Sequence, residues 1–188
     1  PTKREESVRW TALAGSVAVL MTVGCAQHRV SAAEVRADAS CGDPNTVSQG
    51  YVLCQGTVSA VPDGATLVVG IEGPCSVGES VVTGRVVVRL VQLQLPARRS
   101  PLGMRAQQAL ASRVMGKRVE VLPSPYQHGG DLVAMVVSGR DQSELQLEAG
   151  LARYRNFGDY ALDWYRACVY QRAEATARDR RVGVWERK

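Results

Sequence analysis

Two side chains in this sequence, Asp63 and Arg89, have the type and setting that phosphate or metal chemistry would need. Asp63 lies in the turn-forming triplet Pro62-Asp63-Gly64, and Arg89 lies in a strand-like run further along the chain. No Asp or Glu occurs between Ser80 and Gly116, so this part of the sequence offers no carboxylate to a divalent cation. A lone arginine on a strand is more often paired with a carboxylate than used in catalysis, and Asp63 is the expected partner.

The histidines and cysteines do not suggest a metal site. His128 has no second His or Cys nearby, His28 has only Cys25 within a few residues, and no cysteine spacing resembles a zinc site. We therefore expect no metal and no other cofactor.

Strand and helix patterns define the elements that position Asp63 and Arg89. The segment 56–69 predicts a hairpin around the turn, and 85–91 predicts a third strand with Val86, Val88 and Leu90 on one face. Gly and Pro gather in 70–79 and 123–130, which favours loops there. The remaining elements expected are strands near 119–121 and 132–137, and helices over 102–114, 143–150 (with Ser143 as N-cap) and about 160–181.

This order of elements resembles the staphylococcal-nuclease-like (thermonuclease) domain family. The resemblance extends over most of the chain and rests on several individually weak motifs in the right order: DGAT at 63–66, VRL at 88–90 followed by Pro96, GKRVEV at 116–121, HGGDLV at 128–133, GLA at 150–152 and GVW at 183–185. It implies an α+β fold, a five-stranded OB-type β-barrel with about three helices, over residues 51–188.

The same resemblance implies that the active site has degenerated. Nucleases of this family hold Ca²⁺ with carboxylates, activate a water with a glutamate and neutralise the phosphate with two arginines. The positions of the two metal ligands correspond here to Ala65 and Gln94, and the position of the general base corresponds to Ala97. One arginine position corresponds to Gly130, so Arg89 is the catalytic-type residue that is retained.

We interpret this pattern as that of a pseudoenzyme, because losing the metal ligands, the base and one arginine together removes the catalytic arrangement. The competing interpretation is that the assumed register is wrong by a residue or two. Shifting the register brings no acidic residue into the stretch 80–116.

The N-terminal segment predicts a membrane anchor. Trp10 to Ala26 carries no charged side chain, which is near the lower limit of about 17 to 25 residues for a transmembrane helix. Trp10 suits a membrane interface, and small residues such as Gly15, Ala18 and Gly24 suit close helix packing. We expect one transmembrane helix within 1–29 and a linker over 30–50; a cleaved signal peptide, a lipoprotein signal ending at Cys25 and a buried soluble helix are the alternatives.

Four cysteines follow the predicted anchor and allow two disulfides. Cys41 and Cys54 flank a Gly/Pro/Asn segment and could close a short loop, which would leave Cys75 and Cys168 as the second pair. Four free thiols in a reducing compartment are the alternative, because pairing cannot be read from spacing.

These features together predict a non-catalytic accessory subunit of a membrane protein complex. Flanking charges place the barrel across the membrane from the N-terminus, and a respiratory-chain complex of the mitochondrial inner membrane, with the barrel in the intermembrane space, is the concrete expectation. A bacterial inner membrane with a periplasmic barrel is the alternative location. A divergent secreted or lipid-anchored Ca²⁺-dependent nuclease and a nucleic-acid-binding module are the alternative functions, the second suggested by the net charge of +5.

Overall fold

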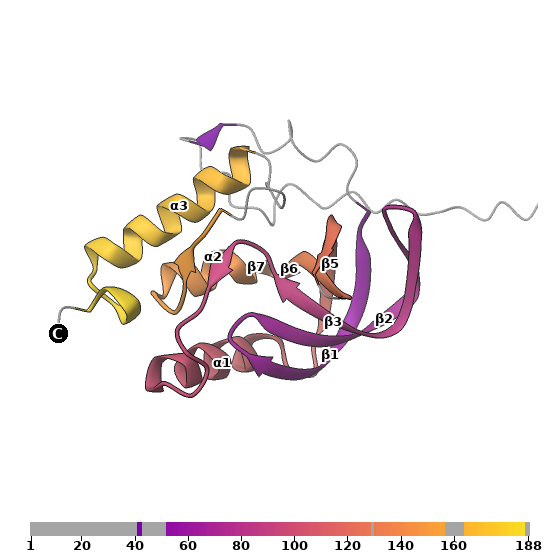
Figure 1. The fold of residues 1–188 in the computed structure, drawn as a ribbon, viewed down its shortest axis with the longest axis horizontal. Helices are drawn as coiled ribbons and strands as arrows, with labels where there is room; N and C mark the ends of the chain where they lie inside the picture. Colours follow the sequence, from indigo (N-terminus) through magenta and orange to yellow (C-terminus); the bar gives the residue numbers. More distant parts are fainter. Residues whose placement is uncertain (1–40, 43–51, 129, 157–163, 187–188) are drawn as a thin grey trace, which may run out of the picture.

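The computed structural model describes residues 41–42, 52–128, 130–156 and 164–186 (Figure 1). Within these ranges, the first three strands are β1 (Cys54–Asp63), β2 (Thr66–Val77) and β3 (Ser80–Leu90), and the longer ones that follow are β5 (Arg118–His128) and β6 (Asp131–Ser138). Three short strands accompany them: β4 (Leu93–Gln94), β7 (Arg140–Asp141) and β8 (Arg153–Tyr154). The helices are α1 (Pro101–Val114), α2 (Gln142–Glu148), α3 (Trp164–Asp179) and the 3₁₀ turn η3 (Gly183–Trp185).

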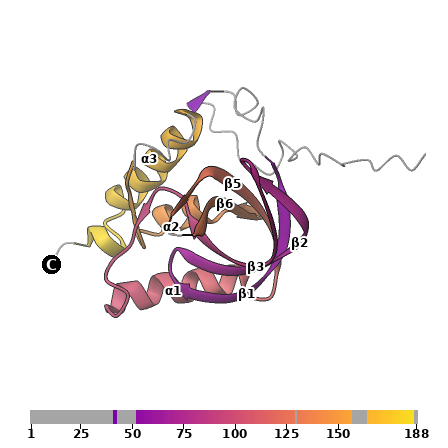
Figure 2. The ribbon, with the colours of Figure 1, turned by 45° about the vertical axis from the view of Figure 1, so that its right-hand side comes forward.

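Five strands form a closed barrel. The strand order is β3-β2-β1-β5-β6-β7, and β3 also pairs with β6, which closes the ring of β1, β2, β3, β5 and β6 (Figure 2). The closing pair is parallel, with Val88, Arg89 and Leu90 opposite Leu132, Val133 and Ala134, whereas the other neighbours in the ring are antiparallel. The predicted five-stranded barrel with three α-helices, an α+β fold, is confirmed.

The alternation of side chains along the strands fills the barrel. On β3, Val88 and Leu90 are buried while Arg85 and Arg89 are exposed, as the pattern predicts. The interior is lined mainly by β-branched residues, which pack well on pleated strands: Val58, Leu67, Val69, Val88, Val119, Val121, Ala134 and Val136.

Helix α1 lies across one end of the barrel (Figure 2) and begins and ends as its sequence suggests. Ser100 is the N-cap and accepts a hydrogen bond from the Gly103 amide, and Pro101 occupies the first turn, where its missing N–H costs nothing. Ala106, Leu110 and Val114 form the buried face, in agreement with the predicted helix.

Three local predictions are wrong. The Gly/Pro segment 70–79 is not a loop, because a bulge between Ile71 and Cys75 lets β2 continue to Val77. The segment after Pro123 is likewise strand, and β5 runs to His128 with an irregularity between Pro123 and Gln127.

The third correction concerns the start of α2. Ser143 is not its N-cap; Asp141 is, and its carboxylate accepts a hydrogen bond from the Ser143 amide at 2.9 Å. A carboxylate here also suits the positive end of the helix dipole.

Candidate functional site

The turn between β1 and β2 positions Asp63. Its Oδ1 accepts a hydrogen bond from the Ala65 amide at 2.9 Å, and its Oδ2 accepts one from the Thr66 hydroxyl at 3.0 Å. This is the local side-chain-to-backbone bonding that makes Asp common in turns. Both carboxylate oxygens therefore serve the turn itself.

Two helices support this turn from behind. A Cβ on Gly64 would lie 2.6 Å from the Cβ of Ala106, so the close approach of the turn to α1 requires glycine. Gln146 on α2 is fully buried and its amide donates hydrogen bonds to the carbonyls of Gly64 and Ala106. The turn is therefore rigidly held by polar contacts as well as by packing.

Arg89 binds a carboxylate other than the expected one. Its Nε lies 2.6 Å from Oδ2 of Asp131, the first residue of β6. The predicted pairing of Arg89 with Asp63 is thus wrong, because the parallel contact between β3 and β6 brings Asp131 to Arg89 while Asp63 is used by its own turn. The Arg89 side chain is 47% exposed and that of Asp131 is 22% exposed, so the ion pair lies at the barrel surface.

The other sequence-predicted positions lie around the same end of β3. The carbonyl of Ala65 accepts a hydrogen bond from the Leu90 amide at 2.8 Å, so its methyl group is next to the strand that carries Arg89. Gln94 and Ala97 follow β3 and are exposed. Gly130 is exposed in the β5–β6 hairpin with a φ of +87°, a conformation that suits glycine and would strain an arginine.

A family comparison can now be set beside this geometry. Residues 87–187 match the family model described as staphylococcal nuclease homologue. The chain belongs to this family. No curated protein matches the sequence. The matched region begins in β3 and extends through α1, the β5–β6 hairpin and both later helices.

The residues present do not fit the Ca²⁺ site expected of a staphylococcal nuclease homologue. Calcium takes six to eight oxygen ligands, usually several of them carboxylates. Here Asp63 is engaged in its turn, the side chains of Ala65 and Ala97 have no ligating atom, and the side chain of Gln94 offers one amide oxygen. No group of three or more His, Cys, Asp or Glu that could hold a metal occurs within the described ranges.

A buried polar network behind the turn was not predicted. Arg113 on α1 donates hydrogen bonds to the side-chain carbonyls of Gln142 and Gln146, at 2.9 and 2.8 Å, and both glutamines are fully buried. Burial lowers the pKa of Arg113, and the positive charge of Arg140 adds to the effect. The four-residue spacing of the two glutamines was the available signal, because it places them on one face of a helix.

A second unpredicted cluster joins α2 to α3. The Tyr170 hydroxyl donates a hydrogen bond to Oδ2 of Asp141 at 2.5 Å, and Arg166 lies 4.0 Å from the same oxygen. Burial is the main reason that the pKa of Asp141 rises to about 6, against the opposing effects of Arg166, Tyr170 and Ser143. Burial and the neighbouring Asp141 raise the pKa of Tyr170. Asp141 and Tyr170 are both buried, so we assign the cluster a structural role.

The four cysteines form two disulfides, with a pairing that differs from the expected one. Cys41 is bonded to Cys168 on α3, and Cys54 is bonded to Cys75, which joins β1 to β2. Pairing of Cys41 with Cys54 was suggested by their short separation. It is wrong because β1 and β2 are antiparallel neighbours, which places Cys54 beside Cys75 with 5.5 Å between their Cα atoms.

The expected anchor residues Trp10, Gly15, Ala18, Gly24 and Cys25 lie outside the described residues. Within the part of the chain that the structure describes, no helix is both long and apolar enough to cross a membrane.

Proposed function

We propose that this staphylococcal nuclease homologue is a non-catalytic binding domain that works as an accessory subunit of a membrane protein complex. One observation carries the non-catalytic part: Arg89, the retained catalytic-type residue, is paired with Asp131 of its own chain at 2.6 Å. An arginine held by an internal carboxylate has lost much of its value for neutralising a phosphate, since a substrate would first have to displace that carboxylate.

The surroundings of Arg89 support the same proposal. The family's metal-ligand positions carry Ala65 and Gln94, and its general-base position carries Ala97. A rigid barrel without these groups retains its surfaces and loops for binding, and a fold by itself does not fix a function.

The membrane location rests on the uncharged segment that starts at Trp10. Two disulfides support a domain in an oxidising compartment, because such bonds are rare in the cytosol. The mitochondrial intermembrane space and the bacterial periplasm both satisfy this condition. The respiratory-chain complex stays a prediction of the sequence.

A nuclease assay tests the non-catalytic part. The purified chain is incubated with single-stranded and double-stranded DNA and RNA in Ca²⁺ or Mg²⁺, with an active nuclease of the family as positive control. We expect no cleavage above background in any condition. Cleavage that disappears with chelator and with Arg89→Ala would contradict the proposal and support the alternative, a divergent Ca²⁺-dependent nuclease.

Gentle detergent extraction tests the accessory-subunit part. We expect the chain to co-migrate with other membrane proteins at a mass well above its own 20.3 kDa. Recovery of the chain as a monomer from membranes would contradict this part while leaving the lack of cleavage unaffected.

A further inference from the structure

One side of the domain gathers arginines from four separate segments. Two guanidinium groups lie over the Trp185 ring of η3: that of Arg153 of β8, at 4.5 Å from the ring centroid, and that of Arg178 of α3, at 4.4 Å. Arg105 of α1 lies 3.8 Å from Glu186, the next residue after Trp185. We call this surface the basic face and define it by Trp185 and its surrounding arginines: Arg99, Arg105, Arg153, Arg178 and Arg181.

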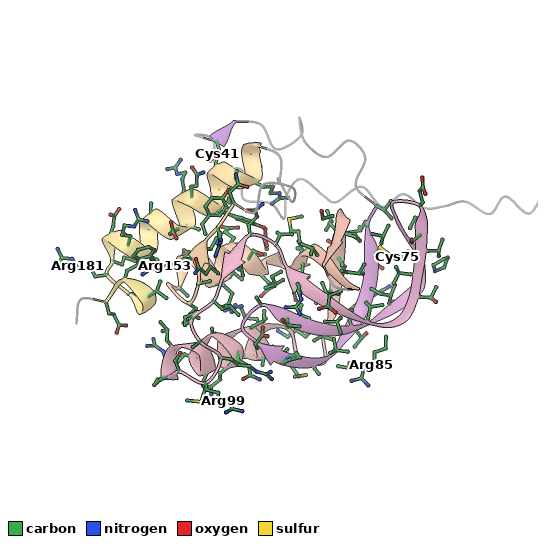
Figure 3. All side chains as sticks on the ribbon, viewed as in Figure 1. Cys41, Cys75, Arg85, Arg99, Arg153 and Arg181 are labelled. Carbon is green, nitrogen blue, oxygen red and sulfur yellow. A yellow bond between two sulfur atoms is a disulfide. The ribbon has the colours of Figure 1, made fainter. Side chains whose placement is uncertain are left out.

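The basic face lies next to the degenerate nuclease site. Arg153 pairs with Gln94 in the small β4–β8 sheet, and Gln94 stands at a lost metal-ligand position. Arg99 follows Gln94 in the sequence and directly precedes Ser100, the N-cap of α1. In Figure 3, Arg153 and Arg181 lie toward the α3 side of the molecule and Arg99 lies below α1, whereas Arg85 lies at the lower right, below the barrel strands.

Several of these arginines have no carboxylate of their own. Arg99, Arg153 and Arg181 are exposed and form no ion pair with any residue in the described ranges. Arg105 forms a long ion pair with Glu186, and the two side chains are 61% and 59% exposed. Exposed ion pairs of this kind contribute little to stability. Arg178 is paired with Glu174 of the same helix at 3.2 Å, so the guanidinium groups whose charge is not matched locally are those of Arg99, Arg153 and Arg181.

The stack on Trp185 orients two of these groups. A guanidinium that lies over an indole ring keeps its N–H groups in its own plane and directed outward, which suits bidentate binding of a carboxylate. Because ring stacking restricts the side chain in advance, binding costs less conformational entropy. Met104 on α1 adds an apolar element, with 54% of its surface exposed; Arg, Trp and Met are enriched in protein interfaces.

We propose that the basic face binds an acidic segment of a partner protein, rich in Asp or Glu. Charge complementarity identifies the partner's chemistry, and the chain already shows a carboxylate bound by an arginine in the pair Arg89–Asp131. This proposal rests on the proposed binding function and specifies the chemistry of the partner.

The contacts of Trp185 favour an acidic protein over a nucleic acid. Proteins that bind single strands stack bases on exposed aromatic rings. Two guanidinium groups already lie over the Trp185 ring, at 4.5 and 4.4 Å from its centroid, so a base that stacked on the ring would have to compete with them. Strands β1, β2, β3 and β6 carry no aromatic residue at all.

The test uses the full chain in detergent and a short fluorescent glutamate-rich peptide as probe, with affinity measured by fluorescence anisotropy. The variants are Arg153→Ala with Arg178→Ala, which removes the stack, and Arg99→Ala, which removes an exposed side chain. Arg85→Ala is the matched control, because Arg85 is an exposed arginine of β3 that does not belong to the basic face. We expect roughly tenfold weaker binding for the double variant, a smaller loss for Arg99→Ala and a change of less than about twofold for the control.

Three results would overturn the proposal. The first is an absence of peptide binding at low salt. The second is a loss of peptide affinity in Arg85→Ala equal to that in the double variant, which would indicate non-specific attraction by net charge. The third is preferential binding of a single-stranded oligonucleotide or of vesicles containing phosphatidylserine, lost in the same variants, which would assign the face to nucleic acid or to lipid.

Two controls keep the outcomes separate. Thermal unfolding of each variant distinguishes a loss of binding from a loss of folding. The variants Arg153→Lys and Arg178→Lys keep the charges but not the planar stack, and they are unfolded in the same way. Nuclease activity of the wild-type chain would contradict the non-catalytic proposal without affecting peptide binding, so each proposal can fail alone.

Discussion

The Nε of Arg89 and the Oδ2 of Asp131 lie 2.6 Å apart across the parallel strand pair that closes the barrel. Asp131 directly follows Gly130, the position at which the family resemblance places a second arginine. This hairpin thus contributes a negative group next to the position where a positive one was expected. The chain itself supplies the anion that Arg89 binds.

A double-mutant cycle measures the strength of this pair. We expect Arg89→Ala and Asp131→Ala, singly and together, to give a coupling free energy of about 0.5 to 1 kcal/mol, because the pair is partly exposed. Urea unfolding is the measurement. A coupling near zero would mean that the two side chains do not interact in solution.

Restoring two carboxylates should restore some metal binding. The variant Ala65→Asp with Gln94→Asp is expected to bind Ca²⁺ with a dissociation constant on the order of 10⁻³ M, the weak end of protein calcium sites. The wild-type chain should show no saturable binding in the same calorimetric titration. The control places the acids elsewhere, at half-buried Ala109 and exposed Gln108, and should behave like the wild type. If the first variant also fails to bind Ca²⁺, the positions assigned to the metal ligands are wrong.

The two disulfides should differ in their contribution to stability. Cys41–Cys168 spans 127 residues and Cys54–Cys75 spans 21, so the chain-entropy model assigns the first about 5 kcal/mol and the second about 3 kcal/mol. Paired Cys→Ser variants, unfolded in urea, test this order. Peptide mapping without reductant checks the pairing itself, and a Cys41–Cys54 peptide would contradict it.

The buried carboxylate of Asp141 should make stability depend on pH. Its pKa is raised from 3.8 to about 6, so the folded state binds a proton more readily than the unfolded state does. Its stabilising contribution is fully present below about pH 4 and is lost as the pH rises through about 6. From the size of this shift, the loss is roughly 3 kcal/mol.

Replacing Asp141 by Asn removes this titration. Tyr170 and Arg166 face Asp141 from α3, and Ser143 and Glu144 face it from α2, and all of them stay in place in Asp141→Asn. We expect the free energy of unfolding to vary less between pH 4 and 6 in this variant than in the wild type. Exposed Asp179→Asn is the control and should keep the wild-type profile; equal profiles for all three proteins would refute the prediction.

The contact between Gly150 and Gly183 should tolerate no side chain. A Cβ on Gly183 would lie 2.0 Å from the Gly150 carbonyl oxygen, and φ at Gly183 is +61°. Gly84 has a similar φ of +71° but open space around it, so Gly84→Ala should cost about 1 kcal/mol of strain and Gly183→Ala clearly more. Thermal unfolding measures both, and equal losses would mean that the close contact contributes nothing.

The barrel was predictable because its strands follow the simplest rule, the alternation of apolar and polar residues. The segment 70–79 was misassigned because Gly and Pro usually end a strand, whereas here a bulge and the disulfide at Cys75 keep it in the sheet. The predicted cysteine pairing was wrong for a similar reason. The pairing depends on which strands are neighbours in the sheet, and the spacing of cysteines along the chain does not contain that information.

The residue types of the candidate site could be assigned from the family resemblance, but their contacts could not. Ala65, Gln94 and Ala97 could be read directly from the motif order. The partner of Arg89 could not, because Asp131 reaches it through a strand pairing between distant parts of the sequence. The arginines of the basic face come from four segments and look like scattered charge until the chain is folded.

The bond between Cys41 and Cys168 makes most of the domain a single covalent loop. A protease that cut the backbone once, anywhere between these two residues, would leave fragments that still travel together. Such a nicked molecule would run as one band on a non-reducing gel and separate into two only after a thiol is added.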